Sequence, residues 1–191
     1  MSRKQIIIAG VARAGKSTVC KELTKRGNYQ HIEADTITFA FQNSFPETGI
    51  SHTDFWGLKE TSKPFSKFLS AWIKEVQKSG TCNKLDYKMA IDLYHILPED
   101  FVEYFPKENC EIYFLGYPNI SVEEKVRQIR HFDTVDDWST QESDESLRKR
   151  IETYIEISKY LQEECKKYGL PFIDVSYNRE EVLEKLINEI I

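Results

Sequence analysis

One short segment of this sequence has the residue types and spacing that bind phosphate. Gly10 to Ser17 reads GVARAGKS and matches the Walker A pattern GxxxxGK[ST] at every fixed position. In such a segment, backbone N–H groups curve around phosphate oxygens, the lysine reaches the β- and γ-phosphates, and the hydroxyl meets Mg²⁺. The residues that we expect to contact a nucleotide and its metal ion are Gly10, Arg13, Ala14, Gly15, Lys16, Ser17 and Thr18.

Two aspartates follow predicted strands. Asp35 comes directly after the run Tyr29–Ala34, and Asp92 closes the run Lys88–Asp92. Each also has a plain structural interpretation, because aspartate is a common helix N-cap and Asp35 precedes Thr36, while Asp92 could cap the end of its strand. Both interpretations stay open on the sequence alone.

A helix with two arginines leads into an acidic stretch. Ser121 and Glu124 form a capping-box pattern that predicts a helix through Ile129, with Arg127 and Arg130 on it. These arginines could bind phosphate, or they could lie on a solvated face of the helix.

The stretch from Phe132 to Glu145 has few apolar residues to anchor it, and it lies between two well-patterned helices. We therefore expect a mobile lid whose closure excludes water; the alternative is an ordinary acidic surface loop. Its aspartates would repel phosphate unless they face solvent or pair with Arg148 and Arg150.

The elements that must position these residues alternate along the chain. Short β-branched or apolar runs predict strands at Gln5–Ala9, Tyr29–Ala34, Lys88–Asp92, Cys110–Leu115 and Pro171–Val175. Helical spacing of apolar residues predicts helices at Lys16–Arg26, Phe65–Lys78, Leu147–Tyr168 and Arg179–Ile190. The alternation predicts an α/β fold of three layers, with a parallel sheet of about five strands between helices.

Composition narrows the class of protein. The chain has 191 residues, 40% hydrophobic and 30% charged, which fits one folded unit. Its net charge of -5 argues against nucleic acid or an anionic membrane as a partner. The four cysteines are scattered, and neither a signal peptide nor a membrane-spanning run is apparent, so we expect a cytoplasmic protein. We expect it to be a monomer or a homodimer.

Two segments match short sequence motifs of GTPases, DxxG and NKxD. Residues 54–57 read DFWG and residues 83–86 read NKLD. In a GTPase both motifs follow buried strands, whereas the residues before each segment here form no apolar strand. We interpret both segments as solvated loops.

The order of elements and the segment Gly10–Thr18 resemble the small P-loop kinases, the group that includes adenylate, shikimate and gluconate kinases. The resemblance implies a single kinase-like domain over residues 1–191, with an acceptor-binding helical region at about 36–80 and a lid at about 127–147. It implies ATP and Mg²⁺ as cofactors. By position, Asp35 would touch the phosphate acceptor, Asp92 would support Mg²⁺, and Arg127 and Arg130 would close over the transferred phosphoryl, with Lys16 beside it.

The sequence departs from nucleotide kinases in its acceptor region. No arginine occurs between Arg26 and Arg127, although a nucleoside monophosphate would want guanidinium contacts there. His52 and His95 lack the spacing of metal ligands, so we interpret them as surface or core polar groups. The region is rich in rings that either pack into the core or stack on an acceptor: Phe39, Phe41, Phe45, Phe55, Trp56, Phe65, Phe68 and Trp72.

The expected function is therefore transfer of the γ-phosphoryl of Mg-ATP to a small-molecule acceptor, and the lack of arginines disfavours a nucleoside monophosphate in that role. The alternative is a nucleotide-binding regulatory protein or an ATPase without an acceptor. A pocket beside the γ-phosphate that is lined by Asp35 would favour the kinase.

Overall fold

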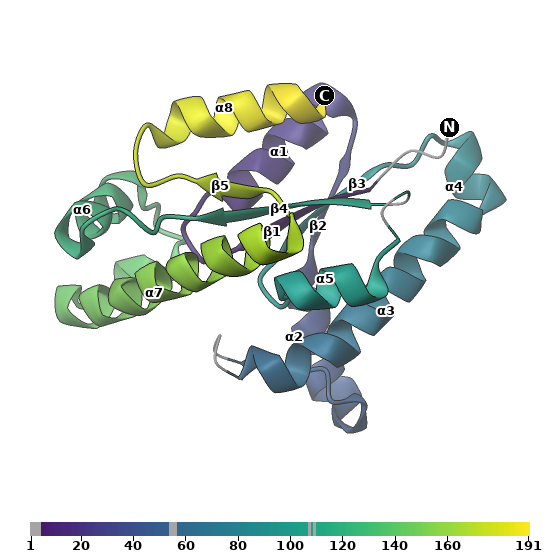
Figure 1. Ribbon diagram of the computed structural model, residues 1–191, viewed down its shortest axis with the longest axis horizontal. Helices are drawn as coiled ribbons and strands as arrows, with labels where there is room; N and C mark the ends of the chain where they lie inside the picture. Colours follow the sequence, from purple (N-terminus) through teal and green to yellow (C-terminus); the bar gives the residue numbers. More distant parts are fainter. Residues whose placement is uncertain (1–4, 54–56, 107, 109) are drawn as a thin grey trace.

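A five-stranded parallel sheet with strand order β2-β3-β1-β4-β5 organises the computed structural model (Figure 1), which describes residues 5–53, 57–106, 108 and 110–191. The strands are β1 (Gln5–Gly10), β2 (Gln30–Glu33), β3 (Met89–Leu93), β4 (Cys110–Gly116) and β5 (Phe172–Asp174). β1 is buried throughout, as its apolar sequence requires for a central parallel strand. Residue Ile8 of β1 pairs with Asp92 of β3 and with Tyr113 of β4.

Helices cover both faces of this sheet (Figure 1). On one face lie α1 (Lys16–Gly27) and α8 (Arg179–Ile190), and on the other lie α5 (Pro98–Tyr104) and α7 (Asp144–Tyr168). The α/β architecture of three layers is thus confirmed. The buried apolar side chains form one core cluster that includes residues of all three layers, such as Leu23, Ile7 and Ile151.

The remaining helices lie at the ends of the sheet. α2 (Ala34–Ser44) and α3 (Leu58–Lys78) extend away from it, α4 (Gly80–Lys84) lies at one end of the molecule, and α6 (Val122–Phe132) lies at the other (Figure 1). Two short 3-10 helices cover Pro46–Thr48 and Trp138–Gln141. Between α6 and α7 the chain is otherwise irregular, as the sequence predicts.

Several predicted boundaries are wrong: β3 ends at Leu93 rather than Asp92, α6 ends at Phe132 rather than Ile129, and α7 begins at Asp144 rather than Leu147. Two further differences bear on the site and the core. β2 ends at Glu33, and Asp35 lies in the first turn of α2, where a carboxylate interacts favourably with the helix dipole. α3 begins at Leu58, before Pro64, rather than at Phe65. A proline inside a helix removes a backbone hydrogen bond, but Leu58, Phe65 and Leu69 are buried on this helix, and their packing outweighs that loss.

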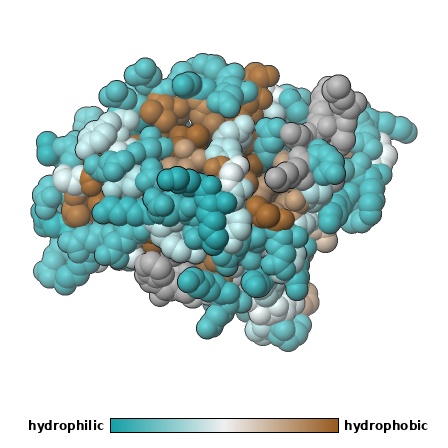
Figure 2. Space-filling model, in the orientation of Figure 1, coloured by the Kyte–Doolittle hydropathy of each residue, from teal (hydrophilic) through white to brown (hydrophobic). Residues whose placement is uncertain are grey.

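The surface is mostly hydrophilic in the view of Figure 2, with hydrophobic side chains in separate patches. Among the residues that the structure describes, no helix combines the length and the hydropathy needed to cross a bilayer.

Candidate functional site

The loop between β1 and α1 is shaped by close contact with β4. Val11 N donates to Leu115 O at 3.1 Å, and Gly10 has a φ of 118°. A Cβ atom on Gly10 would lie 2.0 Å from Leu115 O, so no larger residue fits. Gly15 also has a positive φ, 109°, and α1 begins directly after it. The phosphate-loop segment 10–17 thus has the two glycines that its backbone conformation requires.

Lys16, Ser17 and Asp92 meet at this loop. Ser17 Oγ donates to Asp92 Oδ2, and Lys16 Nζ lies 3.9 Å from Asp92 Oδ1 and donates to Val11 O at 3.2 Å. His31 Nε2 lies 3.7 Å from Asp92 Oδ2. Burial raises the pKa of Asp92, but the nearby His31, the charge of Lys16 and the hydrogen bond from Ser17 outweigh it, and the net pKa is below its ordinary value. Asp92 is therefore ionised at neutral pH.

These groups fit a magnesium ion by their chemistry. The Ser17 hydroxyl and the Asp92 carboxylate are oxygen donors, the type that Mg²⁺ prefers, and Mg²⁺ usually keeps waters and binds substrate phosphates in addition. In the described part of the chain, no group of three or more His, Cys, Asp or Glu residues is arranged to hold a metal ion by itself. The site therefore fits a cation that arrives with phosphates.

A cavity of about 680 Å³ lies over the phosphate loop. Its lining brings together the predicted residues Arg13, Gly15, Lys16, Ser17, Thr18, Asp35 and Asp92. The other two predicted residues, Gly10 and Ala14, are buried and do not line the cavity. The prediction thus finds the part of the wall that the phosphate loop, Asp35 and Asp92 form, and the roles of these residues remain predictions. It does not find the polar lining residues Lys21, Glu33, Lys125, Gln128 and Arg179.

Three further cationic residues line this cavity and were not predicted: the exposed Lys21 of α1 and the more buried Lys125 and Arg179. Lys125 of α6 is 2% exposed and donates to Arg13 O at 3.1 Å, with its Nζ 4.0 Å from the centre of the Tyr117 ring. Burial, and then the charges of Arg179 and Arg13, lower the pKa of Lys125 to about 7. Arg179 begins α8 and donates to Thr18 Oγ1 at 3.4 Å. Neither Lys125 nor Arg179 belongs to a motif, so no local signal identifies them.

The acidic stretch is tied to the phosphate loop. The Arg13 guanidinium donates to Asp137 Oδ1 at 2.5 Å and also to Asp133 Oδ1. Asp137 Oδ2 in turn accepts from Thr134 N at 2.8 Å. Asp133 and Asp137 thus pair with Arg13 rather than with Arg148 or Arg150, and Arg150 pairs with Glu142. The reason is proximity, since α6 places this stretch beside Arg13. Asp136 is exposed, which is the other arrangement expected for these aspartates.

Neither predicted lid arginine lines the cavity. Arg127 pairs with Glu124 at 2.7 Å, and its side chain is 73% exposed. Arg130 donates to Ser139 O at 2.6 Å, to Glu142 O at 2.7 Å and to Asp144 Oδ1. In this structure Arg127 is on a solvated helix face, as the alternative interpretation has it, and Arg130 holds the acidic stretch together.

A second cavity of about 810 Å³ adjoins the first. The two share Ala12, Lys16, Asp35 and Trp138 as lining residues. The second cavity is also lined by His52, Thr53 and Tyr94 and by α7 residues that include Lys149, Arg150 and Tyr154. Asp35 and Lys16 thus stand where the phosphate-loop cavity meets a further cavity.

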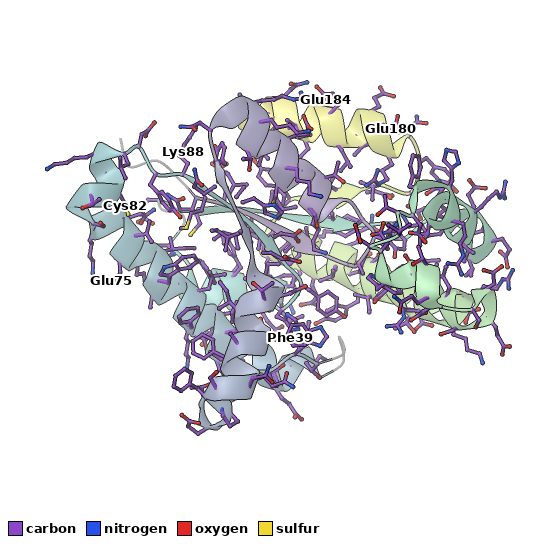
Figure 3. All side chains as sticks on the ribbon, turned by 180° about the vertical axis from the view of Figure 1, so that it is seen from behind. Phe39, Glu75, Cys82, Lys88, Glu180 and Glu184 are labelled. Atoms are coloured by element: carbon purple, nitrogen blue, oxygen red, sulfur yellow. The ribbon has the colours of Figure 1, made fainter. Side chains whose placement is uncertain are left out.

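Most of the aromatic residues of the acceptor region pack among themselves. Phe65 is buried, and the Phe41 and Phe68 rings meet edge to face with centroids 4.8 Å apart. Trp72 stacks on Phe68. Phe55 and Trp56, and with them most of the DFWG segment, lie outside the described residues. The NKLD segment lies on and after α4, marked by Cys82 in Figure 3, at the end of the molecule opposite α6, whose Lys125 contacts the phosphate loop.

The parallel sheet, its strand order and the phosphate loop after the central strand define an α/β protein of the P-loop class. Two solved structures share this fold over nearly the whole chain. A gluconokinase from Sinorhizobium meliloti 1021 has 17% identity and a TM-score of 0.58, covering 99% of this chain and 92% of that one. A shikimate kinase from Bacteroides thetaiotaomicron has 15% identity and a TM-score of 0.53, covering 98% of each chain.

The chain therefore has the fold of the small P-loop kinases. No protein-family model matches it, and no curated protein matches its sequence.

Proposed function

We propose that this protein transfers the γ-phosphoryl group of ATP to a hydroxyl group of a small-molecule acceptor. The observation that carries the proposal is the position of Asp35 on the wall of both cavities. A kinase needs a carboxylate where the γ-phosphate meets a second substrate, whereas a nucleotide switch or an ATPase does not. The fold, shared with a gluconokinase and a shikimate kinase, supports the same proposal.

The proposed reaction is a direct displacement. Asp35 accepts the proton of the acceptor hydroxyl, and that oxygen forms a bond to the γ-phosphorus. The bond from the γ-phosphorus to the bridging oxygen breaks, and ADP leaves with its electron pair. Asp35 suits this role because it is ionised: burial raises its pKa, but the hydrogen bond and charge of His95, together with the charge of Lys16, lower the pKa below its ordinary value.

Positive side chains would bind the phosphates and stabilise the charge that develops on them. We assign this role to Lys16 and, from their place in the cavity, to Arg13, Lys125 and Arg179 in place of Arg127 and Arg130. Bound Mg²⁺ would neutralise phosphate charge, and Ser17 and Asp92 are the residues that would hold it, Asp92 directly or through water.

The acceptor would lie in the second cavity, between the region 36–80 and α7. A nucleoside monophosphate suits it poorly, because apart from Lys16, which it shares with the first cavity, its lining cations are Lys149 and Arg150, and these pair with Glu145 and Glu142. In this proposal residues 1–191 act as one catalytic unit, and residues 127–147 contain its lid.

The proposal is tested by measuring ADP formation from Mg-ATP with panels of nucleosides, sugars and hydroxy acids. We expect one acceptor class to raise the rate at least about tenfold, and both Lys16→Ala and Asp35→Asn to lose that increase while the far-UV circular dichroism stays unchanged. A rate that is the same with every acceptor would favour the ATPase or regulatory alternative.

A further inference from the structure

A buried histidine lies directly behind Asp35. His95 Nδ1 lies 3.0 Å from Asp35 Oδ1, although the two residues are 60 positions apart in the sequence. His95 follows β3 and is 1% exposed, whereas the Asp35 side chain is 37% exposed. The pair thus joins a cavity-lining carboxylate of α2 to the interior of the protein.

The direction of this hydrogen bond follows from the charge of Asp35. The hydrogen bond and charge of His95 and the charge of Lys16 outweigh burial and keep the pKa of Asp35 low, so the carboxylate is ionised. An ionised carboxylate only accepts hydrogen bonds, and therefore His95 Nδ1 carries the proton and donates it.

The other ring nitrogen of His95 has no comparable partner. His95 Nε2 is buried and makes no hydrogen bond among the described residues. Leaving a buried polar atom unpaired costs free energy, and a phenylalanine would fill the same space without that cost. Within the described part of the chain, the hydrogen bond to Asp35 is therefore the only polar contact that accounts for an imidazole at this position.

Aromatic rings fix the imidazole from the acceptor side. The His52 ring meets His95 edge to face with centroids 4.8 Å apart, and Phe39 of α2, labelled in Figure 3, stacks on His52 at 4.5 Å. Tyr94 meets His95 at 5.2 Å. Burial and then the charge of His95 lower the pKa of His52, so at neutral pH His52 adds no charge beside the pair.

We propose that His95 is a positioning residue for Asp35: it holds Oδ1 so that Oδ2 is left to accept the proton of the acceptor hydroxyl. This inference rests on the proposed function, because it assigns Asp35 the role of general base. His95 and, through its ring contact with His95, His52 then support the reacting carboxylate, although both histidines look isolated in the sequence. A misplaced carboxylate lowers the rate of phosphoryl transfer more than it lowers the affinity for substrates, because transfer is sensitive to small errors in position.

The test compares His95→Asn with His95→Gln. The asparagine amide can reach the place of Nδ1, whereas the glutamine amide reaches the place of Nε2. With the acceptor that the panel assay identifies, we expect His95→Asn to keep kcat within about threefold and His95→Gln to lose about 10- to 100-fold, with KM for ATP unchanged in both. Equal kcat values for the two variants would overturn the role of His95.

A measurement on the unsubstituted protein guards against variants that fail to fold. In ¹⁵N spectra of the histidine rings at pH 8, we expect a proton on His95 Nδ1, and a signal that shifts in Asp35→Ala while that of the exposed His131 does not. A bare Nδ1 would overturn the inference. Absence of transfer with every acceptor would instead overturn the proposed function, so the two failures are distinguishable.

Discussion

At the scale of single residues, charge is concentrated around Asp92. Its carboxylate accepts from Ser17 and lies near Lys16 and His31, so it balances positive charge beside the phosphate loop. The amide of Asp92→Asn would keep a hydrogen-bond acceptor for Ser17 but would lose the charge.

We predict that Asp92→Asn lowers the apparent affinity for Mg²⁺ in turnover assays, because a carboxylate that binds the metal or its waters loses its charge. The Mg²⁺ concentration that gives half-maximal rate should rise by about tenfold or more. Superimposable Mg²⁺ titrations of the variant and the unsubstituted protein would assign Asp92 a structural role at the end of β3.

Lys125 makes stability depend on pH. Its pKa is about 7 in the folded protein and has the ordinary value of 10.5 in the unfolded chain. Between these values the unfolded chain binds more protons, so the free energy of unfolding should rise with pH, by up to about 1.4 kcal/mol per pH unit, and flatten below pH 7. Lys125→Met keeps the length of the side chain and should flatten this slope in urea unfolding between pH 7.5 and 9.5. Parallel pH curves would contradict the prediction.

A site residue could be predicted only where the sequence immediately around it forms a recognisable pattern. Lys16 and Ser17 stand in a contiguous motif, and Asp35 and Asp92 stand near the ends of readable strands. Lys125, Arg179 and His95 reach the site only because the fold joins α6, α8 and the end of β3 to it. A lysine on an amphipathic helix normally indicates a solvated face, and nothing in the sequence distinguishes one that packs on Tyr117.

At the scale of elements, the acidic stretch is the part whose chemistry differs most from expectation. Two of its aspartates bind Arg13: the side chain of Asp133 is 5% exposed and that of Asp137 is 27% exposed, whereas Asp136 faces solvent. We call Arg13, Asp133 and Asp137 the latch. In this arrangement two carboxylates bind the arginine to which we assign a role in binding nucleotide phosphates.

We predict that Asp133→Asn/Asp137→Asn opens the latch. Amide hydrogen exchange of residues 133–142 should quicken by about tenfold in the free protein, and the Kd for a non-hydrolysable ATP analogue should fall several-fold, because Arg13 is released and negative charge is removed. Asp136→Asn/Glu145→Gln is the matched control, since it removes the same number of charges from the same stretch outside the latch. Equal effects of the control and the latch variant would show that charge alone, and not the latch, is responsible.

The strands were readable from sequence because buried parallel strands are short apolar runs bounded by polar residues. α2 was less readable, since Ala34–Ser44 contains Thr36, Ile37 and Thr38, which favour strands. The start of α3 was missed because Pro64 usually marks a boundary. In both cases burial against β3 or the core decides the structure, and that contact is not local.

At the scale of the whole molecule, the strand order places the site. The chain moves from β1 to β2 and back through β3, then crosses to β4 and β5 on the other side of β1. Ligands of such sheets bind beyond the carboxyl ends of the strands where the direction of winding changes. Asp92 near the end of β3 and the phosphate loop after β1 meet there, and α2 and α7 bring a second cavity beside them.

The central claim, transfer to a hydroxyl rather than to water, is tested most directly by ³¹P NMR of the products formed from Mg-ATP and the acceptor. We predict a phosphate-ester signal that grows in equal amount with ADP, with little inorganic phosphate, and loss of that signal in Asp35→Asn. Stoichiometric inorganic phosphate with no ester, at the same rate in Asp35→Asn, would contradict the account.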